Sequence, residues 1–311
     1  MSLPDEWHVA RGRSISLQRP VVMGVLNLTH DSFHGASRVE ADDVARLAAA
    51  MVEVGADVLD LGAESTRPGS TPVPAESQMA RLIPAVRAIR SLPDARASAI
   101  PISIDTTHAS VARAAYEAGA EIVNDTSAGR DDPAMLATAA ELGLGLVLMH
   151  RLREPTSDSY SDGYVRAPRY PWGVVASVRE FLAERVAEAC RAGVREESMV
   201  VDPGLGFGKS VEDNLELMRA TSELAPGSIP VMSALSRKSF VGRVSLGRDS
   251  EASERLSGTL AFSVLHLGFG AMIFRVHDVR EHREALDAAI SLLGTADASL
   301  TTGVPGPIGE W

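Results

Sequence analysis

The chain has 311 residues, of which 45% are hydrophobic and 23% charged, and its formal net charge at pH 7 is −11. This composition is ordinary for a globular protein, and a chain of this length buries a sizeable core. The acidic balance and the lack of a Lys/Arg run argue against nucleic acid as a partner. No apolar run approaches the roughly 20 residues that a membrane helix needs, so we expect no membrane association.

Two features of the sequence favour a location in the cytoplasm. The N-terminal residues lack the basic and apolar regions of a secretory signal. Cys190 is the only cysteine, so no internal disulfide is possible, which fits a reducing compartment. Its neighbours in a helical pattern are Val186 and Ala189, which is typical of a packed side chain rather than a reactive thiol.

Short apolar runs alternate with amphipathic helical patterns along the chain. The runs are continuous rather than alternating, as in parallel strands that are covered on both faces. The predicted strands are Val21–Leu28, Val58–Gly62, Ile102–Asp105, Ile122–Asn124, Leu144–His150, Met199–Asp202, Pro230–Leu235 and Ala271–Val276. Strand–helix units in this number predict an α/β fold, a closed (β/α)8 TIM barrel. An open doubly wound sheet is the second interpretation, but no Gly-x-Gly-x-x-Gly follows the first strand.

The predicted barrel, a single domain over residues 21–293, is flanked by two shorter segments. Residues 1–20 form an N-terminal extension with alternating apolar side chains, which predicts a short β-hairpin that closes the bottom of the barrel. Residues 294–311 are rich in Gly, Pro, Thr and Ala, which predicts a loose C-terminal tail. Residues 151–172 show no clear periodicity, so we expect a long loop after the fifth strand, at the active-site end.

Polar motifs follow almost every predicted strand. The segment 202–209, Asp-Pro-Gly-Leu-Gly-Phe-Gly-Lys, is the most informative, because its glycines allow a sharp turn and a close approach of the backbone to a ligand. In a TIM barrel the carboxyl ends of the strands share the face that holds the active site. The other motifs are Asn27–Phe33, Glu64–Gly69, Ser103–Thr106, Asn124–Asp125, Ser236–Phe240 and Arg275–Asp278. A helix cap or an ion pair explains one such residue, but not all of them together.

These motifs, in this order, resemble those of the dihydropteroate synthase family of folate biosynthesis over roughly residues 7 to 293. The resemblance implies a transferase that condenses 7,8-dihydropterin-6-ylmethyl diphosphate with p-aminobenzoate, giving 7,8-dihydropteroate and pyrophosphate. The family is typically dimeric through late helices, so the resemblance implies a homodimer. The family is also a target of sulfonamides.

The resemblance also implies which residues bind the pterin. Carboxylate, amide and ammonium groups match the donor–acceptor edge of a bicyclic heterocycle. The implied pterin site is Asp105, Asn124, Met149, Asp202, Phe207, Lys238 and Arg275. The implied catalytic residues are Asp105, Asp202, Lys238 and Arg67. For Met149, a place in the barrel core is an equally good interpretation.

Two further sites are implied for the diphosphate and the aromatic amine. Arginine forks suit phosphate oxygens, and the implied diphosphate site is Asn27, Arg67, Arg275 and His277. Asn27 would also contact Mg²⁺, the one cofactor expected, which takes its other oxygens from substrate and water. The implied p-aminobenzoate site is Thr66, Arg67, Pro68, Phe207, Lys238 and Ser239.

The chain departs from the family pattern in the loop after the first strand, in the segment after the fifth strand and at Ala234, where the family usually has a glycine. His30 stands where the family commonly has proline, and this leaves open a non-catalytic pterin-binding paralogue. A second alternative is a barrel that binds methylated folate for a corrinoid methyltransferase. Such a barrel needs no diphosphate-binding residues, so the set Arg67, Arg275 and His277 argues against it. Lys209 follows Gly208 without the glycine spacing of a Walker loop, so we expect it at the surface or at a helix start.

Overall fold

The computed structural model of the protein describes residues 4–28, 38–65, 67–164 and 166–293. The tail predicted for residues 294–311, the altered loop at His30 and Thr66 of the implied aminobenzoate site lie outside the described residues. The division of the chain into an N-terminal extension, a barrel domain and a tail stays a prediction.

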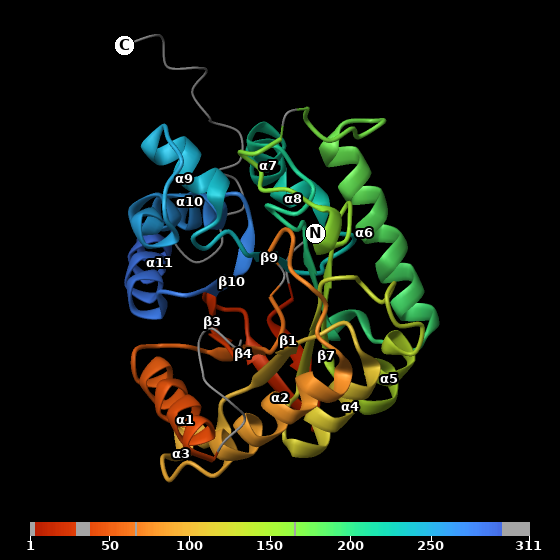
Figure 1. The fold of residues 1–311 in the computed structure, drawn as a ribbon, viewed down its shortest axis with the longest axis vertical. Coiled ribbons are helices and arrows are strands. Elements are labelled where there is room, and N and C mark those ends of the chain that lie inside the picture. Colours follow the sequence, from red (N-terminus) through yellow and green to blue (C-terminus); the bar gives the residue numbers. More distant parts are fainter. Residues whose placement is uncertain (1–3, 29–37, 66, 165, 294–311) are drawn as a thin grey trace.

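In the described part of the chain, eight parallel strands close into a barrel in the order β10-β3-β4-β5-β6-β7-β8-β9, surrounded by helices (Figure 1). The strands are β3 (Val21–Asn27), β4 (Val58–Gly62), β5 (Ile102–Asp105), β6 (Ile122–Asp125), β7 (Gly145–Met149), β8 (Met199–Asp202), β9 (Val231–Ser233) and β10 (Ala271–Val276). All residues of β4 to β8 are buried, which explains why continuous apolar runs marked them in the sequence. The predicted TIM barrel is confirmed.

The predicted strand bounds differ from the observed ones only at the ends. β7 lacks the predicted first residue, Leu144, and the last, His150, while β9 is shorter than the predicted Pro230–Leu235. Leu144 and Leu235 are nonetheless buried, at 2% and 1% exposure. An apolar run therefore continues through buried residues that have already left the strand ladder, and sequence alone does not separate the two.

The helices lie around the strands and cover the outside of the barrel (Figure 1). They are α1 (Arg38–Glu53), α2 (Ala75–Arg90), α3 (Ala95–Ala99), α4 (Ala109–Ala118), α5 (Met135–Leu142), α6 (Val174–Arg191), α7 (Val211–Arg219), α8 (Thr221–Leu224), α9 (Ser239–Leu246), α10 (Leu256–Gly268) and α11 (Val279–Leu293). Three short 3-10 turns of the described chain are η1 (Pro155–Ser157), η2 (Glu196–Ser198) and η3 (Ala252–Arg255). Within the described ranges, no helix is long and apolar enough to cross a membrane.

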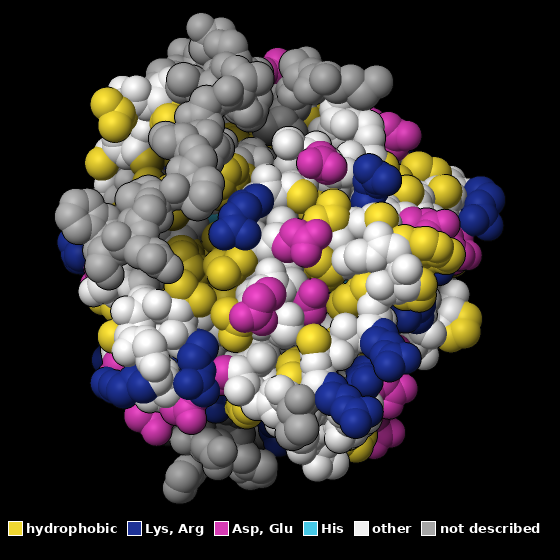
Figure 2. Space-filling view, turned by 90° about the horizontal axis from the view of Figure 1, so that it is seen from above, with side chains coloured by type: hydrophobic (Ala, Val, Ile, Leu, Met, Phe, Trp, Pro, Cys, Tyr) yellow, Lys and Arg dark blue, Asp and Glu magenta, His cyan; other side chains and the backbone are white. Residues whose placement is uncertain are grey.

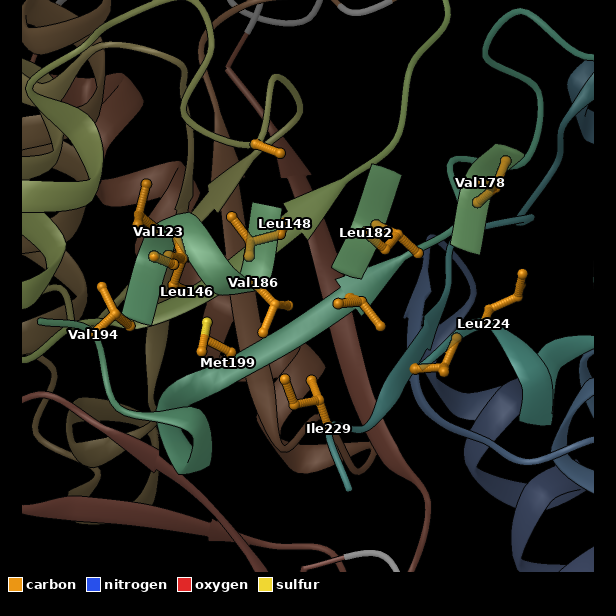
Figure 3. Packing of buried hydrophobic residues seen from close by; sticks show 14 of the residues in the cluster. Val123, Leu146, Leu148, Val178, Leu182, Val186, Val194, Met199, Leu224 and Ile229 are labelled. Atoms are coloured by element: carbon orange, nitrogen blue, oxygen red, sulfur yellow. The ribbon is translucent and has the colours of Figure 1, made fainter. Parts of the chain in front are cut away.

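The core between strands and helices is built from branched aliphatic side chains. Figure 3 shows one part of it, where Leu182 and Val186 of α6 lie close to Leu146 and Leu148 of β7. These four side chains are at most 6% exposed. Burying each of them contributes roughly 1.5 to 3 kcal/mol, so the helix packing that holds the strand ends in place is strong.

The N-terminal hairpin closes the end of the barrel opposite the polar strand ends. β1 (Glu6–Val9) pairs antiparallel with β2 (Arg13–Ser16), which confirms the predicted hairpin. Trp7 is fully buried, and its indole N–H donates to the carbonyl of Ser198 at 3.0 Å. Gly145 begins β7, and a methyl group built on it would lie 2.9 Å from Val9. The glycine therefore permits the close approach of the hairpin.

The surface carries both signs of charge. On the face in Figure 2, the Lys and Arg side chains are interspersed with Asp and Glu side chains and with apolar ones. That face offers no continuous basic surface, in keeping with the net charge of −11.

Candidate active site

Polar side chains converge at the carboxyl ends of the strands. Asp105 ends β5, Asn124 lies near the end of β6, and Asp202 ends β8. In the strand register Asp105 is opposite Asn124, and Asp202 is opposite Met149 of β7. Because the strands of a parallel barrel end on one face, these residues and Arg275 of β10 share one site.

Arg275 connects the buried carboxylates of this site. Its guanidinium donates through Nε to Asp60 Oδ2 at 2.6 Å and through Nη2 to Asp105 Oδ2 at 2.8 Å. The amide of Asn124 donates to the same Asp60 oxygen at 3.3 Å. Asp60 is fully buried. Asp60 therefore joins Asn124 to Arg275, and Arg275 in turn holds Asp105.

Asp60 is a site residue that the strand-end motifs do not reveal. It lies inside the predicted strand Val58–Gly62 rather than after it. A lone carboxylate in an apolar run is the signal that could have found it, since a buried ionised group needs a cation or hydrogen-bond donors. Its other oxygen, Oδ1, has no hydrogen-bond partner among the described residues, and neither does Ser103 Oγ, opposite Asp60 on β5.

Burial controls the protonation of the carboxyl groups. It raises the pKa of Asp105 to about 7, with Arg275 opposing the shift and the nearby Asp60 adding to it. Burial likewise raises the pKa of Asp202, with Lys238 opposing the shift. Neutral and ionised forms of Asp105 are therefore both accessible near pH 7, so the site can adapt to a neutral or a cationic heterocycle.

The glycine loop, residues 203–209, folds over Asp202. Asp202 Oδ1 accepts a hydrogen bond from the N–H of Gly204 at 2.7 Å. Gly204 has φ +66°, and a methyl group built on it would lie 1.8 Å from the carbonyl oxygen of His150. Only glycine fits there, because both the backbone angle and the space exclude a side chain.

Lys238 reaches the site from the residue before α9. Its ammonium donates to the carbonyl of Leu205 and lies 4.4 Å from the centroid of the Phe207 ring, within cation–π range. Burial lowers its pKa to about 8, while the negative charge of Asp202 opposes that shift. The structure thus brings Asp202, Phe207 and Lys238 together, as the implied pterin site requires.

Lys209 corrects the expectation of a surface position. It is fully buried, and its ammonium lies 2.9 Å from the carbonyl oxygen of Phe207 and 2.9 Å from Nδ1 of His150. The helix-start part of the expectation is right, because the next residue, Ser210, is the N-cap of α7. The glycine loop turns the Lys209 side chain inward, beneath itself. Local sequence does not show this.

His277 lies beside Ser236 at the end of β10. Its Nδ1 is 3.0 Å from the Ser236 hydroxyl, and its backbone N–H donates to the same oxygen at 3.2 Å. Burial, followed by the charges of Arg275 and Arg237, lowers the pKa of His277 to about 4. The imidazole is therefore neutral near pH 7, so it would meet an anion as an N–H donor rather than as a cation.

Asn27 and Arg67, the other members of the implied diphosphate site, border this region. Asn27 ends β3 and is exposed; it is opposite Gly62, which is in turn opposite Asp105. Arg67 is exposed on the loop after β4. After burial and the charges of Arg275 and Arg237, the positive charge of Arg67 also lowers the pKa of His277.

The implied aminobenzoate site is only partly described. Phe207 and Lys238 are in contact, Ser239 is the first residue of α9 and is 9% exposed, and Pro68 is half-buried on the loop after β4. Met149 is 2% exposed at the end of β7, which fits either the ring face or the barrel core.

A cavity of about 210 Å³ opens beside Asp105. It lies between the loop after β4 and the loop after β7, and it is lined by Glu64, Ser70, Pro72, Asp105, Thr106, Thr107, His108, Thr126, Asp131, Arg151, Glu154, Pro155 and Thr156. Gln78 holds its wall by donating to Glu64 at 2.7 Å and accepting from Thr106 at 2.7 Å. Burial raises the pKa of Glu64.

A resident metal would need ligands that this site does not supply by itself. Among the described residues, no group of three or more His, Cys, Asp or Glu side chains could hold a metal ion. Asn27 offers one neutral oxygen, which fits Mg²⁺ only if substrate and water provide the remaining ligands.

Comparisons with known proteins agree with this geometry. The model of a family described as pterin binding enzyme matches residues 23–277. The dihydropteroate synthase of Mycobacterium leprae (strain TN) is 41% identical over 276 residues, 88% of this chain and 93% of that protein. That of Escherichia coli (strain K12) is 38% identical over 278 residues, 89% of this chain and 93% of that protein.

Solved structures show the same similarity. The Xanthomonas albilineans dihydropteroate synthase with 4-aminobenzoic acid has a TM-score of 0.81 and 36% identity, covering 94% of this chain and 99% of that one. The Burkholderia cenocepacia dihydropteroate synthase complexed with 7,8-dihydropteroate has a TM-score of 0.81 and 37% identity, covering 94% of this chain and 98% of that one.

The barrel and its buried set of carboxylates, amide and cations therefore define a pterin-binding enzyme. With relatives of this identity and coverage, the chain belongs to the dihydropteroate synthase family.

Proposed function

We propose that this chain is a dihydropteroate synthase, a transferase of folate biosynthesis. It condenses 7,8-dihydropterin-6-ylmethyl diphosphate with p-aminobenzoate to give 7,8-dihydropteroate and pyrophosphate. The observation that carries the proposal is the buried network in which Arg275 holds Asp60 and Asp105 while Asn124 donates to Asp60. Such a set of fixed donors and acceptors suits a flat, polar heterocycle at the carboxyl end of a barrel.

The pterin lies, in this proposal, between the Arg275 network and the glycine loop. Asp105 and Asn124 meet one part of its polar edge, and Asp202 and Lys238 meet another. Met149 and Phe207 are the apolar neighbours of its faces. The carboxylates stabilise positive charge that develops on the pterin as its C–O bond breaks.

The leaving diphosphate lies on the side of Asn27 and His277. Arg67 and Arg275 supply positive charge there, and neutral His277 donates an N–H. The bond between the methylene carbon and the bridging oxygen breaks, and its electron pair leaves with the pyrophosphate. Separation of the two charges across one buried site is the main electrostatic contribution to catalysis.

The aromatic amine attacks the same methylene carbon. A carbon–nitrogen bond forms, and the amine proton passes to pyrophosphate or water. An aryl amine is nucleophilic when neutral, so orientation by Pro68, Phe207 and Ser239, with Thr66, matters more than a strong base. Lys238 lies next to Phe207 and serves both the pterin and the amine.

Pyrophosphate release tests this function directly. With both substrates present, the protein should release one pyrophosphate for each 7,8-dihydropteroate formed, and omission of p-aminobenzoate should stop the release. A coupled assay measures the first product, and chromatography measures the second. Binding of the pterin without any release would identify a non-catalytic paralogue instead.

We propose Mg²⁺ as the cofactor, held by Asn27 and the substrate diphosphate, where it neutralises phosphate charge. Because only one protein oxygen is offered, Mg²⁺ should strengthen the binding of pyrophosphate severalfold and leave the binding of a pterin without diphosphate unchanged. Calorimetry with each ligand, with and without the ion, measures this. Tight binding of Mg²⁺ to the protein without ligand would contradict the proposal.

We also propose a homodimer in the cytoplasm. Leu265 of α10 and Leu292 of α11 are 54% and 89% exposed, and such apolar side chains on late helices support a subunit contact there. The single cysteine supports a reducing compartment.

A further inference from the structure

The segment after β7 packs against the glycine loop at Gly208. This segment, residues 151–164 and 166–172, is here named the strap. The N–H of Gly208 donates to Asp158 Oδ2 at 2.8 Å, and its carbonyl accepts from the Tyr170 hydroxyl at 2.7 Å. Gly208 has φ +68°, and a methyl group built on it would lie 2.4 Å from Cβ of Leu152. Three strap residues therefore surround one glycine.

The groups that hold Gly208 are themselves fixed. Asp158 Oδ1 accepts from the backbone N–H of Ser159 at 2.9 Å and from the Tyr164 hydroxyl. This leaves Asp158 Oδ2 oriented toward the glycine loop. Burial raises the pKa of the Tyr170 hydroxyl, which keeps it protonated as a donor.

Two further side chains, those of Lys209 and Asn214, also hold the glycine loop. The ammonium of Lys209 donates to the carbonyl of Phe207 at 2.9 Å. Asn214 Oδ1 accepts from the N–H of Gly206 at 2.7 Å, and its amide donates to the strap hydroxyl of Ser161 at 3.0 Å. Phe207 thus lies between two anchored residues, with its ring 4.4 Å from the Lys238 ammonium.

The strap also contacts the other loop of the active site. Its Pro155 carbonyl accepts from the N–H of Gly69 at 2.7 Å. Gly69 belongs to the loop after β4 that carries Arg67 and Pro68. One segment therefore joins the glycine loop to the loop implied in binding the aromatic amine.

We propose that the strap is a positioning element for the condensation, in which Asp158 and Tyr170 hold Gly208 so that Phe207 stays against Lys238. A loop with several positive-φ glycines has many alternative conformations, and external hydrogen bonds remove that freedom before substrate binds. The expected effect on kinetics rests on the proposed function. The expected effect on the conformation of the glycine loop does not.

A double-mutant cycle tests the kinetic part. Tyr170→Phe removes only the hydroxyl and should lower kcat/KM about three- to tenfold, the worth of one hydrogen bond. In a Phe207→Leu background the same change should have almost no further effect, because the strap acts through Phe207. Tyr160→Phe, an exposed tyrosine of the strap, is the matched control and should be neutral. Full additivity of the two losses would overturn the proposal.

Hydrogen exchange tests the structural part even if the protein released no pyrophosphate. Asp158→Ala should speed amide exchange in residues 206–209 at least tenfold, while Asp162→Ala on the same strap should leave it unchanged. Exchange in the hairpin β1–β2 reports whether the whole fold has loosened. Unchanged amide exchange in residues 206–209 of the Asp158→Ala variant would overturn the proposal that the strap holds the glycine loop. Absent pyrophosphate release by the wild type would count against the proposed function only.

Discussion

Replacing Arg275 by methionine should lower kcat/KM at least about 100-fold and destabilise the protein by about 3 to 5 kcal/mol at pH 8. The guanidinium contacts the buried carboxylates of Asp60 and Asp105, at 2.6 and 2.8 Å. Methionine keeps the apolar stem but leaves both carboxylates without their cation. Loss of a buried partner costs more than the pair itself contributes, because an uncompensated charge stays behind.

The pH dependence of the stability loss identifies its cause. The pKa of Asp105 is about 7 in the folded protein and about 3.9 in an unfolded chain, so the folded state binds more protons between these values. The free energy of unfolding therefore falls as the pH rises from about 4 to 7. Without Arg275, which lowers this pKa, the fall should extend to higher pH and be larger in total.

Urea unfolding of Arg275→Met and the wild type at pH 5 and pH 8 measures the difference. The variant should lose clearly less stability at pH 5, where Asp105 can be neutral. Arg243→Met is the control, since Arg243 of α9 forms an exposed ion pair with Asp249, which lies just after that helix. The stability lost with this pair should stay below about 1 kcal/mol. Equal losses for Arg275→Met at both pH values would mean that lost packing, rather than charge, is the cause.

The sequence predicted much of this site because of how a barrel is built. Continuous apolar runs mark strands that are buried on both faces, and the polar residues that follow them must meet at one end. Asp105 and Asp202 end their strands, as predicted. Asn124 and Arg275 lie within one residue of a strand end and also join the site.

Asp60, Lys209 and the strap could not be predicted in the same way. Asp60 lies inside a strand, so its role depends on Arg275 reaching it from another strand. Lys209 follows a glycine loop whose path decides whether the side chain points outward or inward. The contact between Asp158 and Gly208 spans 50 residues and leaves no periodic pattern in either segment.

Replacing Lys238 by methionine should lower kcat/KM at least about 30-fold, equivalent to about 2 kcal/mol of transition-state stabilisation. Its ammonium donates to the Leu205 carbonyl and lies over the Phe207 ring. Its positive charge also opposes the rise in the pKa of Asp202 that burial causes. Loss of the cation leaves Asp202 in the same buried place without its compensating charge. Both the pterin and the amine should bind less well, because Lys238 borders both.

The titration of Lys238 gives this prediction a pH profile. Its pKa of about 8 means that the ammonium becomes neutral above that pH, so kcat/KM of the free enzyme should fall there. Lys238→Arg keeps the charge at all accessible pH values. If this variant retains measurable activity, its alkaline fall should move upward by at least about one pH unit. An identical fall in the variant would assign it to another group.

Nuclear magnetic resonance can follow that proton directly, since Lys209 and Lys238 are the only lysines of the chain. Lysine labelled with ¹³C at Cε should give two resonances, and the Lys238→Arg variant assigns them. Burial lowers the pKa of Lys238 to about 8 and that of Lys209 to about 7, so both should titrate well below the ordinary value of about 10.4. Bound pyrophosphate should raise the midpoint of Lys238, because an added anion favours the ammonium. Two midpoints near 10.4 would mean that water reaches both groups, and the electrostatic role of Lys238 would then be small.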